Sequence, residues 1–165
     1  MPLGNTLVFP SPHFNAEDTV RAIVSENCNI FSGTPTFLVD IVAKQRELNL
    51  KMPEIDLVCV GGSVLSPQVV KDVENVLKVK KISSVYGLTE TASAVFQTLS
   101  EDSNQITEEF VGVPLSQVEA KVIDKDGNTV PFGVAGELYI RTVCNMLGYF
   151  GDPEKTKETI GCDRW

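Results

Sequence analysis

The chain has 165 residues, and its shares of hydrophobic residues (42 %) and charged residues (22 %) are those of an ordinary folded domain. Its 22 acidic residues outnumber its 14 Lys and Arg and give a net charge of −8, which opposes binding to nucleic acid or to an anionic membrane surface. No apolar run reaches the twenty or so residues of a membrane span. The single His13 and four scattered cysteines do not predict a zinc site.

Two capped helices are predicted in the first fifty residues. Asn15 is a suitable N-cap, and the apolar residues after it have helical spacing. A short strand is expected at residues 30–31. Thr34 and Pro35 then have the residue types of an N-cap and a first helical position. This second helix is expected to run to about Leu48, with its inner face formed by Phe37, Leu38, Ile41 and Val42.

The next segment has the pattern of a βαβ unit. An apolar strand at residues 55–60 is followed by a glycine turn, a helix that begins after the N-cap Ser66, and a second strand at residues 81–86. Two strands joined by a crossover helix form a parallel pair. Ligands of parallel sheets bind at the carboxyl ends of the strands, so the residues directly after each strand are candidates for a site.

The last third is predicted to be β-rich. Residues 100–109 form a polar stretch typical of a surface loop, and we expect the boundary between two lobes there. Alternating apolar and charged residues predict strands at 118–122 and 137–141. Asp152 and Pro153 predict the start of a last short helix.

The predicted fold is therefore α/β. A parallel βαβ sheet lobe, residues 1–109, is expected to be followed by a β-rich lobe, residues 110–165.

The clearest chemical signal is Tyr86-Gly87-Leu88-Thr89-Glu90, directly after a predicted strand. The Tyr86 ring can stack on a purine, and Gly87 allows close approach of the main chain to a ligand. Thr89 can donate to a phosphate oxygen, and Glu90 offers the hard oxygen ligand that Mg²⁺ prefers. These residue types suit a nucleotide with its metal ion. A strand end with a turn glycine and a solvated glutamate would give the same pattern.

Gly61-Gly62-Ser63 also follows a predicted strand and could form a slot for the flat face of a base. Neither the Walker phosphate loop nor the Gly-x-Gly-x-x-Gly dinucleotide motif occurs. A serine hydrolase with Ser63 as nucleophile is disfavoured, because Leu65 stands where the nucleophile elbow needs glycine and His13 precedes the serine.

Five short motifs follow one another along the chain: Val60-Gly61-Gly62-Ser63, Tyr86-Gly87-Leu88-Thr89-Glu90, Gly136-Glu137-Leu138-Tyr139-Ile140-Arg141, Met146-Leu147-Gly148-Tyr149 and Asp163-Arg164-Trp165. Taken in this order, they resemble the core motifs of adenylate-forming acid:CoA ligases. Within that family, two segments are most similar to the medium-chain acyl-CoA synthetase branch, the family-member-2 type: residues 31–36 and residues 145–156. The resemblance covers nearly the whole chain and implies part of the large N-terminal domain of such an enzyme.

The resemblance implies a role for each matching position. Thr89 would hold the α-phosphate and Glu90 the Mg²⁺, as the catalytic pair. Gly136 to Arg141 and Gly148-Tyr149 would be scaffold of the small β-lobe. The cofactor-binding residues implied are Gly61, Gly62 and Ser63 beside the adenine and acyl tunnel, Tyr86 on the base, and Ser84, Val85, Gly87 and Leu88 in the adenylate pocket.

The implied reaction uses ATP, Mg²⁺ and coenzyme A. A fatty carboxylate would first form an acyl-adenylate, and the thiol of coenzyme A would then displace AMP. The expected partners are a fatty acid and nucleotides, without nucleic acid. The resemblance implies a mitochondrial location, although residues 1–13 carry no basic charge of a transit segment.

Several motifs of the family are not among these 165 residues: the Ser-Gly-Thr-Thr-Gly phosphate loop, a Thr-Gly-Asp segment and the lysine-bearing C-terminal lobe. We therefore expect an internal piece of a ligase, inactive by itself because groups that act on one transition state are strongly non-additive. Open sheet edges and exposed apolar faces predict that the isolated piece self-associates or is only marginally stable. Two alternatives remain, an adenylate-binding or interaction fragment without turnover and a structural α/β domain without a site.

Overall fold

The computed structural model describes residues 4–104 and 110–165. The chain divides into two compact units. The first unit contains residues 1–85 and 98–112, and the second contains residues 86–97 and 113–165. Of the predicted polar loop, residues 105–109 lie outside the described residues.

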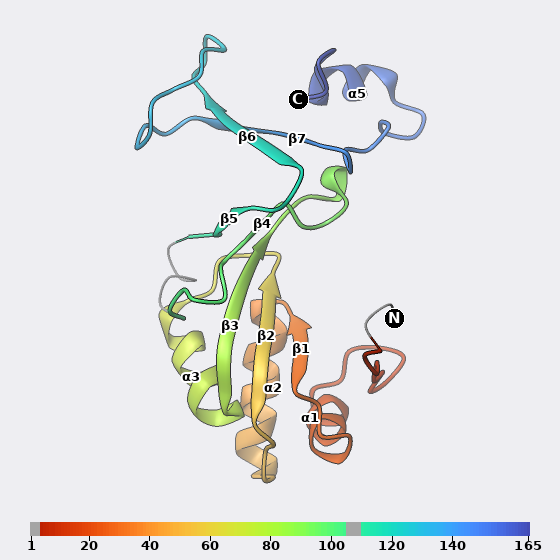
Figure 1. Ribbon diagram of the computed structural model, residues 1–165. Coiled ribbons are helices and arrows are strands. Elements are labelled where there is room, and N and C mark those ends of the chain that lie inside the picture. Colours follow the sequence, from red (N-terminus) through yellow and green to blue (C-terminus); the bar gives the residue numbers. More distant parts are fainter. Residues whose placement is uncertain (1–3, 105–109) are drawn as a thin grey trace. The chain divides into compact units, whose positions relative to one another are not determined.

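Helices and parallel strands alternate in the first unit (Figure 1). Strand β2 pairs in parallel with both β1 and β3, which confirms the predicted βαβ unit. The observed strands extend up to two residues beyond the predicted ends. The last residue of β3, Tyr86, is the first residue of the second unit. The elements are α1 (Ala16–Ser25), β1 (Ile30–Gly33), α2 (Pro35–Leu48), β2 (Ile55–Gly61), α3 (Pro67–Leu77) and β3 (Val79–Tyr86).

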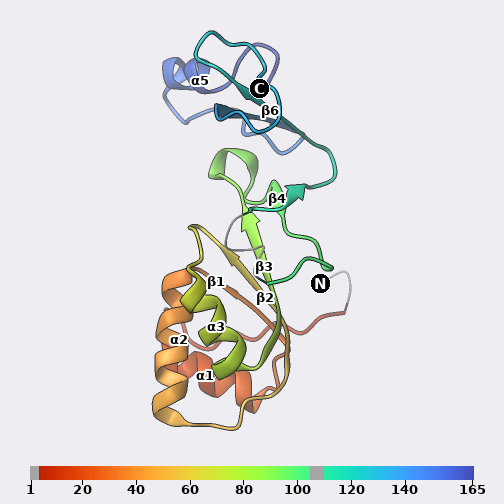
Figure 2. The ribbon, with the colours of Figure 1, turned by 90° about the vertical axis from the view of Figure 1, so that its left-hand side faces the viewer.

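One hydrophobic core joins the helices and strands of this unit. Helices α2 and α3 lie on the same face of the strands (Figure 2). Leu38 of α2, Val58 of β2 and Val73 of α3 are fully buried in the same cluster. In β2, buried residues alternate with exposed or half-buried ones from Val58 onward, so the face that meets the helices is the buried one.

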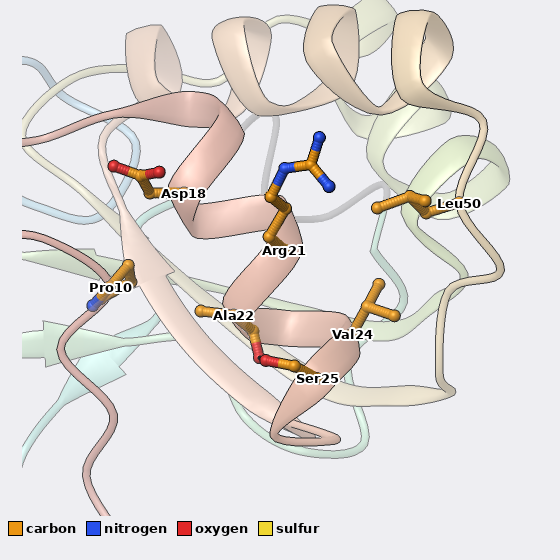
Figure 3. Close-up of a pocket in the computed structure, with 7 residues that line it drawn as sticks. All are labelled: Pro10, Asp18, Arg21, Ala22, Val24, Ser25 and Leu50. Carbon is orange, nitrogen blue, oxygen red and sulfur yellow. The ribbon is translucent and has the colours of Figure 1, made fainter.

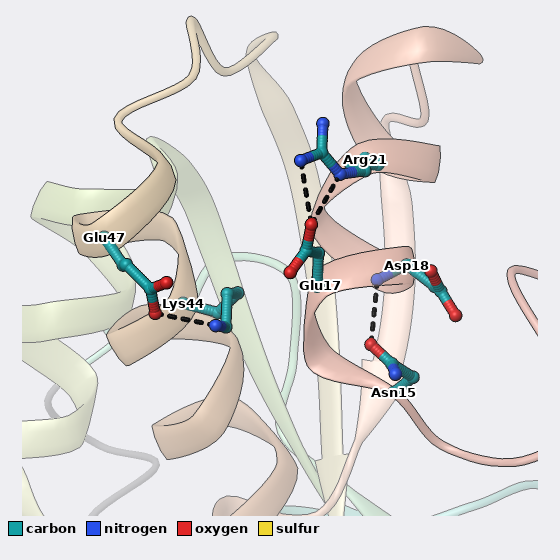
Figure 4. Close-up of polar contacts among 6 residues, drawn as sticks. All are labelled: Asn15, Glu17, Asp18, Arg21, Lys44 and Glu47. Carbon is teal, nitrogen blue, oxygen red and sulfur yellow. Dashed lines mark hydrogen bonds and ion pairs between the residues drawn. The ribbon is translucent and has the colours of Figure 1, made fainter.

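The helices of the first unit begin where the sequence predicts. The Asn15 side chain accepts a hydrogen bond of 3.0 Å from the main-chain N–H of Asp18 and caps α1 (Figure 4). Thr34 caps α2 and Ser66 caps α3 in the same way, each followed by proline.

Two ion pairs link neighbouring turns of α1 and α2. Glu17 and Arg21 pair at 2.8 Å, and Lys44 and Glu47 pair at 2.6 Å (Figure 4). The hydrogen bond from Arg21 holds the pKa of Glu17 below its usual value. Exposed pairs of this kind add little to stability.

We expect Asn15→Ala to lower the free energy of unfolding by about 1 kcal/mol, because an N–H in the first turn of α1 loses its acceptor. Asn15→Ser keeps an acceptor at this position and is the matched control. Urea unfolding, followed by the helical circular dichroism signal, measures both. Equal stability of the alanine and serine variants would contradict the capping role.

One residue of the predicted inner face of α2 lies elsewhere. Leu38, Ile41 and Val42 are buried, whereas Phe37 is 38 % exposed. Its ring stacks on Phe14 with 3.9 Å between ring centroids. Helical periodicity alone misplaced Phe37, because its partner lies in the segment before α1.

The second unit consists mainly of short strands and connecting segments, and it includes residues 86–97, which precede the predicted boundary. Its elements are η1 (Thr89–Thr91), β4 (Phe96–Gln97), β5 (Val113–Pro114), β6 (Val118–Ile123), β7 (Glu137–Thr142) and α5 (Pro153–Thr159). Strands β6 and β7 lie where strands were predicted and pair antiparallel, and Asp152 caps α5 as predicted. The short antiparallel pair of β4 and β5 was not predicted. No helix within the two described stretches of chain is long and apolar enough to cross a membrane.

Trp165 is held against the β6–β7 sheet by two cations. The Lys121 ammonium lies 4.3 Å from the ring centroid, and the Arg141 guanidinium carbon lies 4.6 Å from it. Such contacts are attractive because the ring face carries partial negative charge. The last residue of the chain is therefore packed on β6 and β7.

Candidate functional site

The double glycine after β2 has a structural role in the first unit. A Cβ atom on Gly61 would lie 3.1 Å from the carbonyl oxygen of Val85, its partner in β3, which is tighter than an ordinary contact. Gly62 has a φ of +94°, in the left-handed region that favours glycine. Ser63 is exposed. The predicted contact of these residues with adenine stays a prediction.

Ser84 is tied to the neighbouring segment by its main chain. Its N–H donates to the Thr98 hydroxyl at 3.0 Å, and its carbonyl accepts from the Thr98 N–H at 3.1 Å. Ser84 and Val85 are half-buried. The Ser84 side chain is therefore the part of this residue most available for the predicted ligand contact.

Residues 86–95 form a tight loop in the second unit. The Tyr86 carbonyl accepts a hydrogen bond of 2.8 Å from the Val95 N–H. The Tyr86 ring meets Phe96 at 6.1 Å between centroids and an angle of 63°. A Cβ atom on Gly87 would lie 1.3 Å from the carbonyl oxygen of Ser93. Glycine is therefore required at position 87 by the loop itself, whether or not a ligand also approaches it.

Thr91 orders this loop and was not singled out by the sequence analysis. Its buried hydroxyl bonds both the N–H of Leu88 at 3.2 Å and the carbonyl of Leu88 at 3.1 Å. Ala92 and Ser93 follow with φ values of 57° and 91°. Positive φ at non-glycine residues stores strain, which clusters at functional sites. The available signal was a hydroxyl residue three positions after Leu88, the spacing of a local side-chain to main-chain turn.

The loop carries the two residues predicted to be catalytic. Thr89 is exposed, and its hydroxyl makes no hydrogen bond within the described residues. Glu90 is half-buried, and its carboxylate accepts a 2.6 Å hydrogen bond from the Tyr149 hydroxyl. This bond, together with one from the Glu90 main chain, holds the pKa of Glu90 below its usual value. Glu90 is therefore ionised at neutral pH.

Glu90 fits the demands of Mg²⁺ but does not form an all-protein metal cage. No cluster of three or more His, Cys, Asp or Glu residues suited to a metal occurs in residues 4–104 and 110–165. Mg²⁺ keeps several waters and commonly binds one or two carboxylates together with substrate phosphates. A carboxylate has about four lone-pair positions, so the Tyr149 bond leaves capacity for a cation.

A surface depression in the first unit does not coincide with any predicted site residue. It has a volume of about 500 Å³, and most of its lining side chains come from α1 (Figure 3). It is lined by Pro10, Asp18, Arg21, Ala22, Val24, Ser25 and Leu50.

A family model and the similar curated proteins point to the same group of enzymes. The family model for the AMP-binding enzyme matches residues 1–150. The chain is 36 % identical to the medium-chain acyl-CoA ligase ACSF2, mitochondrial, of Danio rerio, and 34 % identical to that of Mus musculus, over 98 % of its own length. It spans only 27 % and 26 % of the lengths of these two relatives.

Solved structures show the same fold. A long-chain-fatty-acid-CoA ligase from Archaeoglobus fulgidus superposes with a TM-score of 0.78 at 22 % identity, covering 88 % of this chain and 31 % of the other. An anthranilate CoA ligase in complex with anthranoyl-AMP gives the same TM-score and identity, covering 28 % of its chain. The α/β architecture is that of acyl-CoA ligases. With a family model that matches residues 1–150, the chain belongs to the AMP-binding enzyme family.

Proposed function

We propose that this chain is part of an ATP-dependent fatty acid:CoA ligase and carries its adenylate-binding loop. The observation that supports this most is the presentation of Thr89 and Glu90. In a member of the AMP-binding family, one tight loop offers an exposed hydroxyl that makes no hydrogen bond to any described residue, and an ionised carboxylate with capacity for a cation. These are the groups that a metal-bound triphosphate requires.

In the first step, an oxygen of the fatty carboxylate attacks the α-phosphorus of ATP, and the bond from this phosphorus to the pyrophosphate oxygen breaks. The Thr89 hydroxyl donates to an α-phosphate oxygen as negative charge grows there. Glu90 would hold Mg²⁺, which when bound would neutralise phosphate charge. Donors fixed where charge develops stabilise the transition state more than the ground state.

In the second step, the coenzyme A thiolate attacks the acyl carbonyl, and the bond to the AMP oxygen breaks. Tyr86 stacks on the adenine ring. The contacts proposed for the adenylate are Gly61, Gly62, Ser63, Ser84 and Val85 in the first unit, and Gly87 and Leu88 in the second unit. The named activity and location of the ACSF2 relatives support a medium-chain fatty acid as substrate and a mitochondrial location.

The 165 residues alone are proposed to bind rather than to turn over. The division proposed from the sequence is an α/β adenine-binding sub-lobe at residues 1–109 and a β-rich sub-lobe at residues 110–165, although residues 86–97 belong to the second compact unit. Removing some members of a catalytic group lowers the reaction rate nearly as much as removing all of them. We therefore expect the isolated chain to retain ligand binding but to lose turnover. Open strand edges favour self-association of the isolated chain.

An unreactive acyl-adenylate analogue tests the proposal in this chain. At about 100 times its dissociation constant, a ligand adds roughly 2.7 kcal/mol to the folded state. For a chain of this size, such a gain raises the melting temperature by roughly 5–10 °C. Thr89→Ala removes a phosphate donor, and we expect it to weaken binding and reduce this rise to less than half.

Thr129→Ala is the matched control, because Thr129 is an exposed threonine of the same unit outside the loop. We expect it to show the full rise. No rise in the unsubstituted chain at saturating analogue, or an undiminished rise in Thr89→Ala, would contradict the proposal.

A further inference from the structure

Glu90 is fixed by a residue 59 positions later in the chain. The Tyr149 hydroxyl donates to Glu90 Oε1 at 2.6 Å, and the Met146 N–H donates to the Glu90 carbonyl at 2.8 Å. All three residues belong to the second unit. Both the side chain and the main chain of Glu90 are therefore held by the segment that follows β7.

Tyr149 is itself held in place by the start of α5. Its N–H donates to the Thr156 hydroxyl at 2.8 Å, and this hydroxyl donates to the carbonyl of Asp152 at 2.7 Å. Asp152 is the N-cap of α5. A continuous series of hydrogen bonds thus runs from the first turn of α5 through Tyr149 to the Glu90 carboxylate.

The turn before Tyr149 is fixed by the end of the chain. The Arg164 guanidinium donates to the carbonyls of Asn145 and Met146, each at 3.2 Å, and the Asn145 side chain donates to the Arg164 carbonyl at 2.9 Å. The segment that holds Glu90 is therefore fixed at both of its ends.

We propose that Tyr149 is a positioning residue that orients the Glu90 carboxylate for Mg²⁺, an inference that rests on the proposed function. One carboxylate oxygen accepts from the tyrosine hydroxyl, and the remaining lone pairs would be available to hold the metal. A glutamate side chain without this bond populates several rotamers. Metal binding must then restrict it to one rotamer, and the lost conformational entropy weakens the affinity. Residues that orient a metal ligand typically change metal affinity or activity by 10–100-fold when removed.

The test uses the full natural polypeptide that contains this chain and does not depend on turnover. Mn²⁺ replaces Mg²⁺, and its binding is titrated by electron paramagnetic resonance with a saturating unreactive ATP analogue. Tyr149→Phe removes only the hydroxyl, and we expect it to raise the Mn²⁺ dissociation constant about 10-fold. Tyr139→Phe is the matched control, because Tyr139 is a half-buried tyrosine of β7 whose hydroxyl bonds nothing in the described chain.

Glu90→Gln and the double variant Glu90→Gln/Tyr149→Phe distinguish a positioning role of Tyr149 from a general loss of structure. If Tyr149 acts through Glu90, Tyr149→Phe weakens Mn²⁺ binding in the natural background and has little further effect once Glu90 is Gln. Equal weakening in both backgrounds would show a merely structural role and overturn the proposal. The KM for Mg²⁺ should rise in Tyr149→Phe while the KM for the fatty acid stays unchanged.

The two possible failures give different results. If Glu90→Gln weakens Mn²⁺ binding and Tyr149→Phe does not, the positioning role is wrong and the metal role of Glu90 stands. If neither variant weakens it, the metal role assigned to Glu90 in the proposed function is wrong as well.

Thr156 gives a second route to the same contact. Thr156→Val removes the hydroxyl that receives the Tyr149 N–H, whereas Thr156→Ser keeps it. We expect weaker Mn²⁺ binding in the valine variant alone. Equal Mn²⁺ affinity in the two variants would contradict the series of bonds from α5 to Glu90.

Discussion

Gly87→Ala is expected to disrupt the loop that carries Thr89 and Glu90. The added Cβ would lie 1.3 Å from the carbonyl oxygen of Ser93 and 2.9 Å from the Cα of Ala94. Both obstacles are main-chain atoms, so no side-chain rotation relieves the clash and the loop must open. We expect a loss of about 3 kcal/mol in stability, at the upper end for overpacking.

Hydrogen exchange of the amides in residues 86–96 measures this change directly. The hydrogen bonds from Val95 to Tyr86 and from Ser93 to Leu88 should lose their protection. Gly33→Ala is the control, because its Cβ would meet Phe37 at an ordinary 3.5 Å. Protection in Gly87→Ala equal to that of the unsubstituted chain would contradict the predicted packing of this loop.

Leu38→Ala should lower the stability of the first unit by about 2–5 kcal/mol. The Leu38 side chain is completely buried in the core shared by the helices and strands, and its removal leaves a cavity. Val39, the next residue of α2, is 48 % exposed. Val39→Ala should therefore change stability by less than about 1 kcal/mol.

Urea unfolding of both variants, followed by circular dichroism, checks the contrast. A similar loss in both would mean that α2 packs differently from the arrangement in Figure 2. The contrast tests the packing register of one helix, because the two positions differ by a single step along it.

Local signals were enough to predict most of the first unit. Asn15, Thr34 and Ser66 each cap a helix, because their side-chain oxygens accept a hydrogen bond from an N–H of the first helical turn. The parallel pairing of β2 and β3 followed from the helix between them. What these signals could not provide was Phe37, whose contact with Phe14 joins segments that share no periodic pattern.

The candidate site likewise contains residues that the sequence indicated and one contact that it did not. The sequence indicated Thr89 and Glu90 by their residue types, and the structure places them on one exposed loop. The sequence did not indicate that Tyr149 contacts Glu90, because β4 to β7 separate the two residues and no spacing rule connects them. Tyr149 was expected to be scaffold, and its hydrogen bond joins that scaffold to the proposed metal ligand.

Trp165, flanked by two cations, is a fluorescent reporter of one unit of this 165-residue chain. It is the single tryptophan in the sequence, and it lies in the second unit. Its fluorescence therefore follows the packing of β6 and β7, whereas the ellipticity of α1, α2 and α3 comes from the first unit. Unfolding curves recorded by the two signals coincide if the units melt as one, and separate if each melts independently.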